Sequence, residues 1–229
     1  MSNLILSGSI AALDGGSDSA IDKHPISAPH LCTRLGLEGD QQADRRHHGG
    51  SERALHYYPQ EHYPYWETFW YAMQLTDSPT PFVPGAFGEN LSDQGWTEET
   101  VHIGDRFRLG QAIVEVSQPR SPCFKLNQRF GYPQMSLLVQ VSGRGGWLMR
   151  VLQEGEVAPD DRLELEQASA RALSVRRCLD ILYNRPFERE SLQLLAAHEA
   201  LSPGWRQHAE NWLGSGAPDR WRRRLFNLP

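Results

Sequence analysis

Residues 112–126, AIVEVSQPRSPCFKL, run from an alternating segment that predicts a β-strand directly into a loop that carries a cysteine. Two prolines in this loop fix φ and remove backbone donors, so the loop is expected to be stiff. Arg120 and Lys125 flank Cys123 with positive charge, which favours a thiolate. The segment therefore suits a nucleophile or a ligand for a soft metal, although a small buried cysteine near two solvated charges explains it equally well.

The composition of the whole chain is that of a soluble globular protein. Its 229 residues are 39% hydrophobic and 22% charged, which allows a full core in one domain and leaves room for a small appendage. The net charge of −5 provides no overall field that attracts nucleic acid or anionic lipid. The three cysteines form no C-x-x-C pair, which argues against a disulfide scaffold or a cysteine-rich zinc site and indicates a reducing cytoplasm.

The sequence predicts neither a targeting segment nor a membrane span. The amino terminus, MSNLILSG, lacks a basic region, and its apolar run is short. No stretch approaches the roughly 18 consecutive apolar residues that a membrane span requires. We therefore expect a soluble cytoplasmic protein.

Further strands are predicted on both sides of the cysteine loop, and they favour a mainly β fold with some α, a β-barrel, for residues 1–167. Residues 59–71, PQEHYPYWETFWY, predict a helix that begins at Pro59 and whose Trp and Tyr side chains serve core and lid packing rather than a cofactor site. Residues 35–48 are polar and punctuated by glycine, which indicates a functional loop. Alternating or apolar segments between turn residues predict strands at residues 4–10, 101–109, 112–118, 146–152 and 161–165.

Residues 168–229 change character and predict a small three-helix carboxy-terminal domain. Apolar residues at helical spacing follow Ser174, which is a suitable N-cap for the first helix. The second helix carries an apolar stripe over residues 192–196, and the third begins at Ser202 and closes at Gly214.

The chain ends on a short basic run, Arg222-Arg223-Arg224. Three arginines are too few to indicate a nucleic-acid surface, so we interpret the run as a solvated helix face and do not expect nucleic acid as a partner. The run also gives this part of the chain a basic face that would attract an acidic protein.

The functional loop contains a pattern suited to an anion. Arg45 and Arg46 precede two histidines and two glycines, a combination that offers guanidinium forks and backbone amides to a phosphate. A solvated loop explains the same residues. Asn90, in a glycine-hinged turn, could read an amide-like edge of a ligand, and the comparable Asp105 is consistent with an ordinary turn residue. The common nucleotide-binding, hydrolase and zinc-protease motifs do not occur.

Five segments, taken together and in this order, resemble a MOSC domain, the module named after the carboxy-terminal domain of molybdenum cofactor sulfurase. The helical tail after residue 168 makes the resemblance closest to the YiiM-type bacterial MOSC proteins. The segments are residues 36–40 (GLEGD), 48–55 (HGGSERAL), 88–91 (GENL), 104–107 (GDRF) and 116–126 (VSQPRSPCFKL).

The resemblance implies a β-barrel that binds a molybdenum cofactor of the molybdopterin type, with Cys123 coordinating the metal. It also implies reduction of N-hydroxylated compounds, including N-hydroxylated bases, as in the related amidoxime-reducing proteins of mitochondria. The family's glutamate and histidine positions map onto Glu38 and His48, which become candidate catalytic groups beside Cys123. Candidates for binding the cofactor are Arg45, Arg46, Asn90, Arg120 and Lys125.

Two further expectations concern partners and alternatives. The chain has no dinucleotide fingerprint and no cysteine cluster for an iron–sulfur relay, so electrons for a small-molecule substrate are expected from a separate reductase, a flavoprotein. The alternative function is a molybdenum cofactor carrier or a sulfur-transfer module in which Cys123 holds a persulfide.

Overall fold

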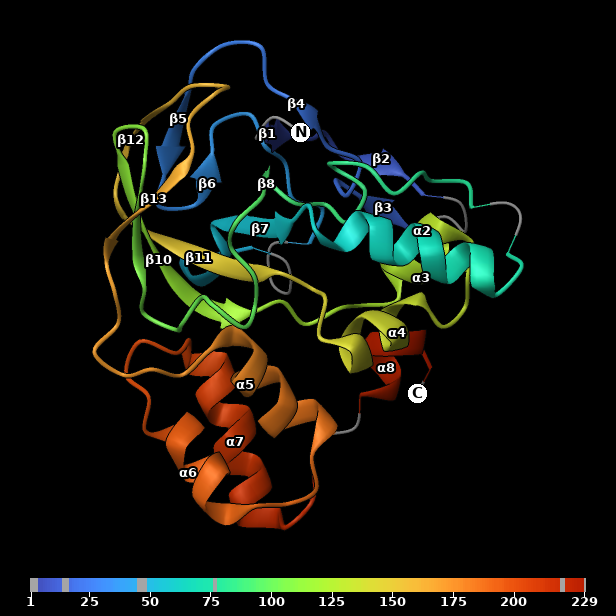
Figure 1. Ribbon diagram of the computed structural model, residues 1–229, viewed down its shortest axis with the longest axis vertical. Coiled ribbons are helices and arrows are strands. Elements are labelled where there is room, and N and C mark those ends of the chain that lie inside the picture. Colours follow the sequence, from blue (N-terminus) through green and yellow to red (C-terminus); the bar gives the residue numbers. More distant parts are fainter. Residues whose placement is uncertain (1–3, 14–16, 45–48, 76–77, 219–220, 229) are drawn as a thin grey trace.

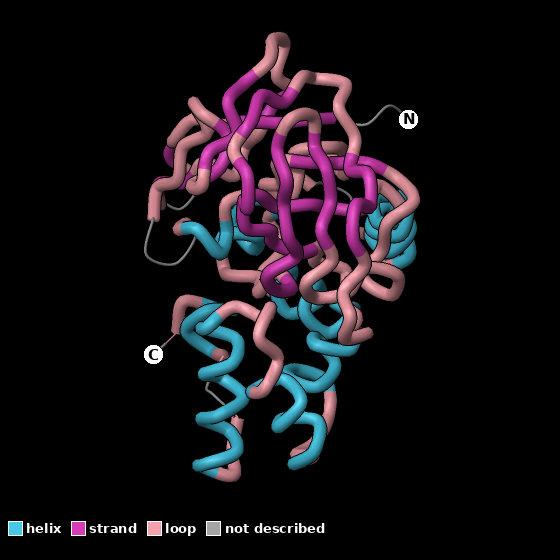
Figure 2. Tube along the Cα trace, turned by 90° about the vertical axis from the view of Figure 1, so that its left-hand side faces the viewer, coloured by secondary structure: helices cyan, strands magenta, loops and turns pink. Residues whose placement is uncertain are grey.

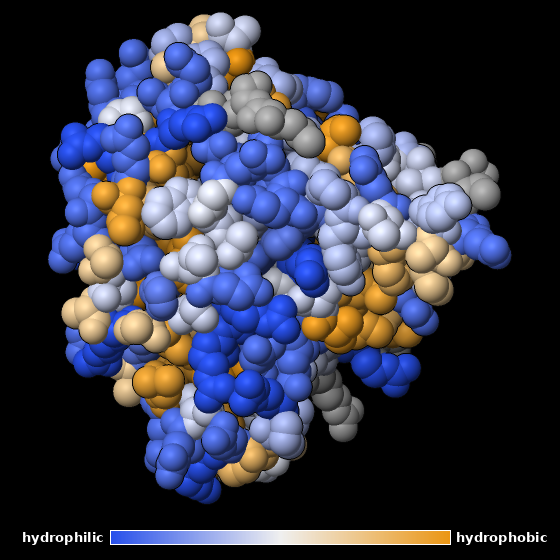
Figure 3. All heavy atoms as spheres, in the orientation of Figure 1, coloured by the Kyte–Doolittle hydropathy of each residue, from blue (hydrophilic) through white to orange (hydrophobic). Residues whose placement is uncertain are grey.

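A computed structural model describes residues 4–13, 17–44, 49–75, 78–218 and 221–228. A curled β-sheet forms one part of the molecule, and a group of helices packs against one end of it (Figure 1). The view turned by 90° shows the same two parts, with the helices beneath the strands (Figure 2). On the face seen in Figure 3, hydrophilic side chains cover most of the surface, and a smaller hydrophobic area lies over the region of the helices α3 (Lys125–Phe130) and α4 (Met135–Ser142).

The main sheet has eight strands in the order β13-β9-β10-β11-β7-β8-β1-β4, and it curls into a half-barrel. Neighbouring strands are antiparallel, except for the parallel pair β7 and β8. The expected mainly β fold is therefore confirmed, as an open half-barrel. The strands are β1 (Leu4–Ser7), β4 (His24–Pro25), β7 (Leu55–Pro59), β8 (Leu91–Asp93), β9 (Arg106–Leu109), β10 (Ala112–Pro119), β11 (Trp147–Gln153) and β13 (Leu163–Gln167).

Two smaller sheets complete the β structure. One pairs β12 (Gly155–Val157), β5 (His30–Thr33) and β6 (Gly36–Leu37), and the other pairs β2 (Ala11–Ala12) with β3 (Asp18–Ser19). The strand predicted at residues 101–109 is wrong over its first half. The backbone of residues 101–103 pairs instead with residues 173–175, at the start of the carboxy-terminal helices. Ile103 N donates to Leu173 O at 2.9 Å, and Val175 N donates to Val101 O at 2.9 Å.

The aromatic helix α2 (His62–Ala72) begins three residues later than predicted, because Pro59 is the last residue of β7. Three of its aromatic side chains pack in the core, as expected, whereas Tyr65 and Tyr71 are exposed. Tyr63, Trp66 and Trp70 are buried in a second hydrophobic cluster together with Phe87 and other rings. Short helices elsewhere in this part of the chain are η1 (Ser51–Arg53), α3 (Lys125–Phe130) and α4 (Met135–Ser142).

The carboxy-terminal helices begin where the caps predict. Ser174 Oγ accepts a hydrogen bond from Arg177 N at 3.1 Å, and Ser202 caps the third helix in the same way. That helix runs on to Ser215, with Gly216 rather than Gly214 at its end. The helices are α5 (Val175–Leu179), continued by the π-helix η2 (Asp180–Asn184), then α6 (Arg189–Ala196), α7 (Pro203–Ser215) and α8 (Arg222–Phe226). None of the described helices is both long and apolar enough to cross a membrane.

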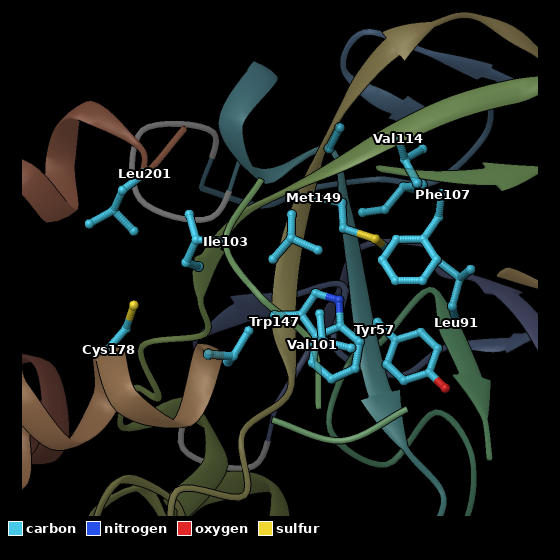
Figure 4. Close-up of a cluster of buried hydrophobic side chains, with 14 of the residues drawn as sticks. Tyr57, Leu91, Val101, Ile103, Phe107, Val114, Trp147, Met149, Cys178 and Leu201 are labelled. Atoms are coloured by element: carbon cyan, nitrogen blue, oxygen red, sulfur yellow. The ribbon is translucent and has the colours of Figure 1, made fainter. Parts of the chain in front are cut away.

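One hydrophobic core extends from the sheet into the helices (Figure 4). Val101, Ile103 and Trp147 lie on the sheet side of this cluster, and Cys178 and Leu201 on the helical side. Since apolar burial is shared between the two parts, each stabilises the other.

The last helix, α8, leaves the group formed by α5–α7 and lies against α4 (Figure 1). The carbonyl of Leu225 accepts hydrogen bonds from Asn127 Nδ2 and Ser136 Oγ, both at 2.7 Å. The chain thus returns to the helices that follow the cysteine loop.

Candidate cofactor-binding site

A cavity opens where the loop after β10 faces the segments around residues 19–23, 40–44 and 87–90. Its lining combines one thiol with several cationic side chains. The thiol is that of Cys123, and the cationic side chains are Arg120, Lys125, Lys23 and Arg53; the imidazole of His56 also lines the cavity.

Cys123 is placed between the end of β10 and the start of α3, and its carbonyl accepts a hydrogen bond from Leu126 N at 3.0 Å. None of the three cysteines forms a disulfide. Cys32 and Cys178 are fully buried, and burial raises the pKa of the Cys32 thiol to about 12 and also raises the pKa of Cys178. Cys123 is half-buried and lines the cavity, so it is the thiol that can meet a ligand there.

Arg120 has a hydrogen-bond donor at this cavity that no described residue uses. Its Nη2 donates to Phe87 O at 3.1 Å, while its buried Nη1 has no hydrogen-bond partner among the described residues. Desolvation lowers the pKa of Arg120, although the nearby Cys123 opposes that shift. A buried guanidinium donor without a partner is costly, and an anionic group in the cavity would satisfy it.

A second cation, Lys23, is held by a buried ion pair. Its Nζ lies 2.6 Å from Asp40 Oδ2, and the two side chains are 8% and 2% exposed. Burial lowers the pKa of Lys23, and the carboxylate of Asp40 counteracts that effect. Asp40 also accepts from Gly8 N at 2.8 Å and from Asn90 Nδ2 at 3.0 Å, so the pair is fixed in place at the cavity wall.

Asn90, predicted to bind the cofactor, lines the cavity, but its amide is used within the protein. Besides its bond to Asp40, Nδ2 lies 3.2 Å from Leu6 O, and Oδ1 accepts from His56 N at 3.1 Å. The side chain therefore joins β1, β7 and the Asp40 loop. It shapes the wall of the cavity rather than offering a spare amide to a ligand.

His56 is a cavity residue that the sequence analysis missed. Its ring Nε2 lies 3.0 Å from Gly145 O, and burial, reinforced by the positive charge of Arg120, lowers its pKa well below the ordinary value. The ring is therefore uncharged at neutral pH. A signal existed in the sequence, because His56 directly follows the HGGSERAL segment. Lys23 and Arg53 were also missed, and Lys23 belongs to no recognised motif.

The structure brings four of the predicted site residues together: Cys123, Arg120, Lys125 and Asn90 all line the cavity. Lys125 Nζ also donates to Asp18 O at 2.7 Å. Arg45, Arg46 and His48 lie outside the described residues. Asp44 and Arg53, which precede and follow those positions in the sequence, both line the cavity.

Glu38 does not line the cavity. Its side chain is exposed, and its backbone is used in pairing, with its N–H bonded to Leu31 O at 2.8 Å and its carbonyl to His30 Nδ1 at 2.8 Å. Gly39, at φ +86, turns the chain directly after it. As a result Asp40, the other carboxylate of the same loop, faces the cavity instead.

The donor set at the cavity fits an anionic ligand that brings its own metal. Within the described parts of the chain, no group of three or more His, Cys, Asp or Glu side chains gathers where it could hold a metal ion. The cavity instead offers the Cys123 thiol, a soft ligand, with Arg120 and other cations around it.

Comparison with known proteins gives matches along the whole chain. Residues 44–164 match the MOSC domain, and residues 173–216 match the YiiM-like, 3-alpha helix domain. Protein YiiM of Escherichia coli (strain K12) is 40% identical over 222 residues, which are 97% of this chain and 96% of that protein. The crystal structure of YiiM from Escherichia coli is similar with a TM-score of 0.81 and 34% identity, covering 98% of this chain and 97% of that chain.

A third relative is a fungal protein named reductase, from Gibberella moniliformis (strain M3125 / FGSC 7600). It is 41% identical over 155 residues, which are 67% of this chain and 27% of that protein.

Proposed function

This chain belongs to the MOSC family, in the form that carries a YiiM-like three-helix domain, and on that premise we propose that it reduces N-hydroxylated compounds with a molybdenum cofactor held at the Cys123 cavity. Family membership supports a function connected with the molybdenum cofactor. The observation that carries the proposal is a half-buried thiol beside a buried guanidinium donor that has no partner among the residues the structure describes.

The residues of the cavity divide the work of holding such a cofactor. Cys123 would coordinate the metal through its thiolate. Arg120, Lys125 and Arg53 would bind the anionic part of the cofactor, with Arg45 and Arg46 proposed to add guanidinium forks to its phosphate. When bound, the cofactor supplies two-electron chemistry, so that R₂N–OH, two electrons and two protons give R₂N–H and water.

Protons for the reduction would have to come from side chains around the cavity. His48 remains a proposed donor, whereas the exposed Glu38 would need to reach the cavity from outside it. His56 is uncharged and faces the Gly145 carbonyl, so its part is to keep the inner wall free of a fixed charge.

Electrons are proposed to come from a separate reductase, a flavoprotein, because the sequence offers no nicotinamide-binding motif. The fungal relative named reductase supports a reductive direction for the chemistry. The exposed Arg222 and Arg223 on α8 are the proposed attraction for an acidic donor.

The test is turnover of an N-hydroxylated amidine by cofactor-loaded protein. We expect reduction with dithionite-reduced viologen, and none with NADPH alone. Cofactor-loaded protein that turns over with neither donor would contradict the reductase proposal, and a persulfide found on Cys123 by mass spectrometry would then favour the sulfur-transfer alternative.

A further inference from the structure

The loop that carries Cys123 is held by the carboxy-terminal part of the chain. Ser121 Oγ lies 2.7 Å from the hydroxyl of Tyr183, and Phe124 N donates to Arg224 O at 2.7 Å. The carbonyl of Pro122 accepts a hydrogen bond from Arg224 Nη1. Residues on both sides of Cys123 are thus bonded to Tyr183 or Arg224, more than 50 residues further along the chain.

The guanidinium of Arg224 is itself fixed from several directions. Its Nη2 donates to Gln140 Oε1 in α4 at 2.6 Å. Its Cζ lies 5.1 Å from the centre of the Tyr183 ring and 5.0 Å from that of Trp221, at distances where a cation is attracted to an aromatic face. The neighbouring Arg222 and Arg223 are exposed. The basic run is therefore only partly a solvated helix face, because Arg224 is built into the protein.

Tyr183 reaches the loop from η2, the π-helix that continues α5. π-helical turns are rare in proteins overall, but those that occur are often found at functional sites. The ring of Tyr183 packs edge-on against Trp205 at 5.4 Å and against Trp221 at 5.0 Å, which leaves its hydroxyl directed to Ser121.

We propose that Arg224 and Tyr183 are positioning residues that hold the Cys123 loop in register with the cavity, so that the helical part of the chain completes a site whose walls come from the sheet. The two prolines stiffen the loop but remove its own donors, so external bonds decide where the thiol lies. This inference deepens the proposed function, yet it concerns only the position of a thiol and can be tested on protein without cofactor.

The test compares alkylation of Cys123 by iodoacetamide, followed by mass spectrometry, in cofactor-free variants. We expect Arg224→Ala to raise the alkylation rate about tenfold, because it removes the charge-assisted bond to the Pro122 carbonyl and the bond to Gln140 that fixes the guanidinium. Arg222→Ala and Arg223→Ala, on the same helix but exposed, should stay within about twofold of the unchanged protein. Arg224→Lys keeps the charge but cannot reach both the Pro122 carbonyl and Gln140 Oε1. Its alkylation rate should therefore fall between that of Arg224→Ala and that of the unchanged protein.

Two internal references separate positioning from general loosening. The buried Cys32 and Cys178 report global opening, and their alkylation rates should not change. Amide exchange at Phe124 N, whose acceptor is Arg224 O, should rise together with Cys123 alkylation. Tyr183→Phe removes only the hydroxyl and should raise the Cys123 rate by about threefold, which keeps the proposal testable if Arg224→Ala fails to fold. Equal Cys123 rates in all variants, or an equal rise at all three cysteines, would overturn it.

Discussion

Burial decides the charge state of individual side chains at the cavity. Lys23 remains paired with Asp40 at 2.6 Å, and His56 is held uncharged. In the described part of the chain, one guanidinium nitrogen of Arg120 has no hydrogen-bond partner. The wall is therefore cationic where a ligand can reach it, even though the chain as a whole carries a net charge of −5. A local arrangement of this kind can bind an anion that the average charge would repel.

Replacing Arg120 should separate ligand binding from stability. We expect Arg120→Ala to weaken cofactor affinity by about one to two orders of magnitude, the value of one hydrogen bond to a charged group. The melting temperature of the cofactor-free protein should stay the same or rise, because a buried, partly unsatisfied guanidinium is removed. The molybdenum retained after dialysis measures the affinity, and calorimetry measures the melting temperature. The exposed Arg108, which pairs with Glu166 at 2.9 Å, offers Arg108→Ala as a control. Loss of stability without loss of affinity would contradict the role given to Arg120.

His56 should leave a mark on the pH dependence of stability. Its pKa is lowered in the folded protein but lies near about 6.5 when unfolded, so the unfolded chain takes up a proton first as pH falls. Uncharged His56 therefore contributes to the free energy of unfolding above about pH 6.5. That free energy decreases below this pH, by up to about 1.4 kcal/mol per pH unit. Urea unfolding of the unchanged protein and of His56→Gln, between pH 7 and pH 5, measures it. The difference in unfolding free energy should narrow as pH falls, and parallel curves would rule out this role for His56.

At the scale of elements, strand ends and turns place the cavity residues. β11 starts directly after Gly146, which has φ +71, and an added Cβ there would collide with the carbonyl of Tyr57. Gly146 N also donates to Glu98 Oε1 at 2.7 Å, and the preceding carbonyl of Gly145 faces His56. This glycine therefore sets both the start of the strand and the inner wall of the cavity.

A pair of glycine substitutions tests that placement. Gly146→Ala should lower the free energy of unfolding by at least about 2 kcal/mol, because strain and collision with backbone coincide. Gly204→Ala, in an exposed turn of α7 with open space around it, should be neutral or stabilising by up to about 1 kcal/mol. Denaturant midpoints of the two variants give the comparison. Equal effects would show that the turn at Gly146 is not constrained.

Sequence patterns predicted the elements that depend on near neighbours and failed where the partner is distant. The alternating segment of β10 and the caps at Ser174 and Ser202 are local signals, and the structure confirms them. Residues 101–103 look like a strand, but their backbone partners lie at residues 173–175, a pairing that no local pattern specifies. The cysteine loop was found because its chemistry is contiguous in the sequence.

The rest of the site depends on the folded chain. Lys23 reaches the cavity from a segment that carries no chemical motif, so only the fold shows its role, whereas His56 directly follows a recognised segment. Arg224 looked like part of a solvated run, because its partners at Pro122 and Gln140 are far away in the sequence.

For the whole molecule, the shared core is the main consequence of the fold. The cluster that contains Ile103 and Trp147 of the sheet side also contains Cys178 and Leu201 of the helical side (Figure 4). Cutting the chain after residue 167 would expose this surface to water. The helices are therefore part of the folding unit as well as of the site.

Thermal unfolding should then be a single transition. We expect one calorimetric peak, with calorimetric and van't Hoff enthalpies that agree, for the cofactor-free protein. A chain that ends at residue 167 should bind a hydrophobic dye and lack a cooperative transition, because half of the interface is missing. Two well-separated peaks for the full chain would mean that the two parts fold independently.

The molybdenum content of purified protein shows whether Cys123 holds the metal of a molybdenum cofactor, as proposed. Protein from a cofactor-competent host should carry close to stoichiometric molybdenum, and protein from a cofactor-deficient host should carry none. The molybdenum content of Cys123→Ser should be lower by about tenfold or more, since the soft ligand is replaced. The buried control Cys32→Ala should retain the metal. A folded Cys123→Ser protein with the molybdenum content of the unchanged chain would contradict the account.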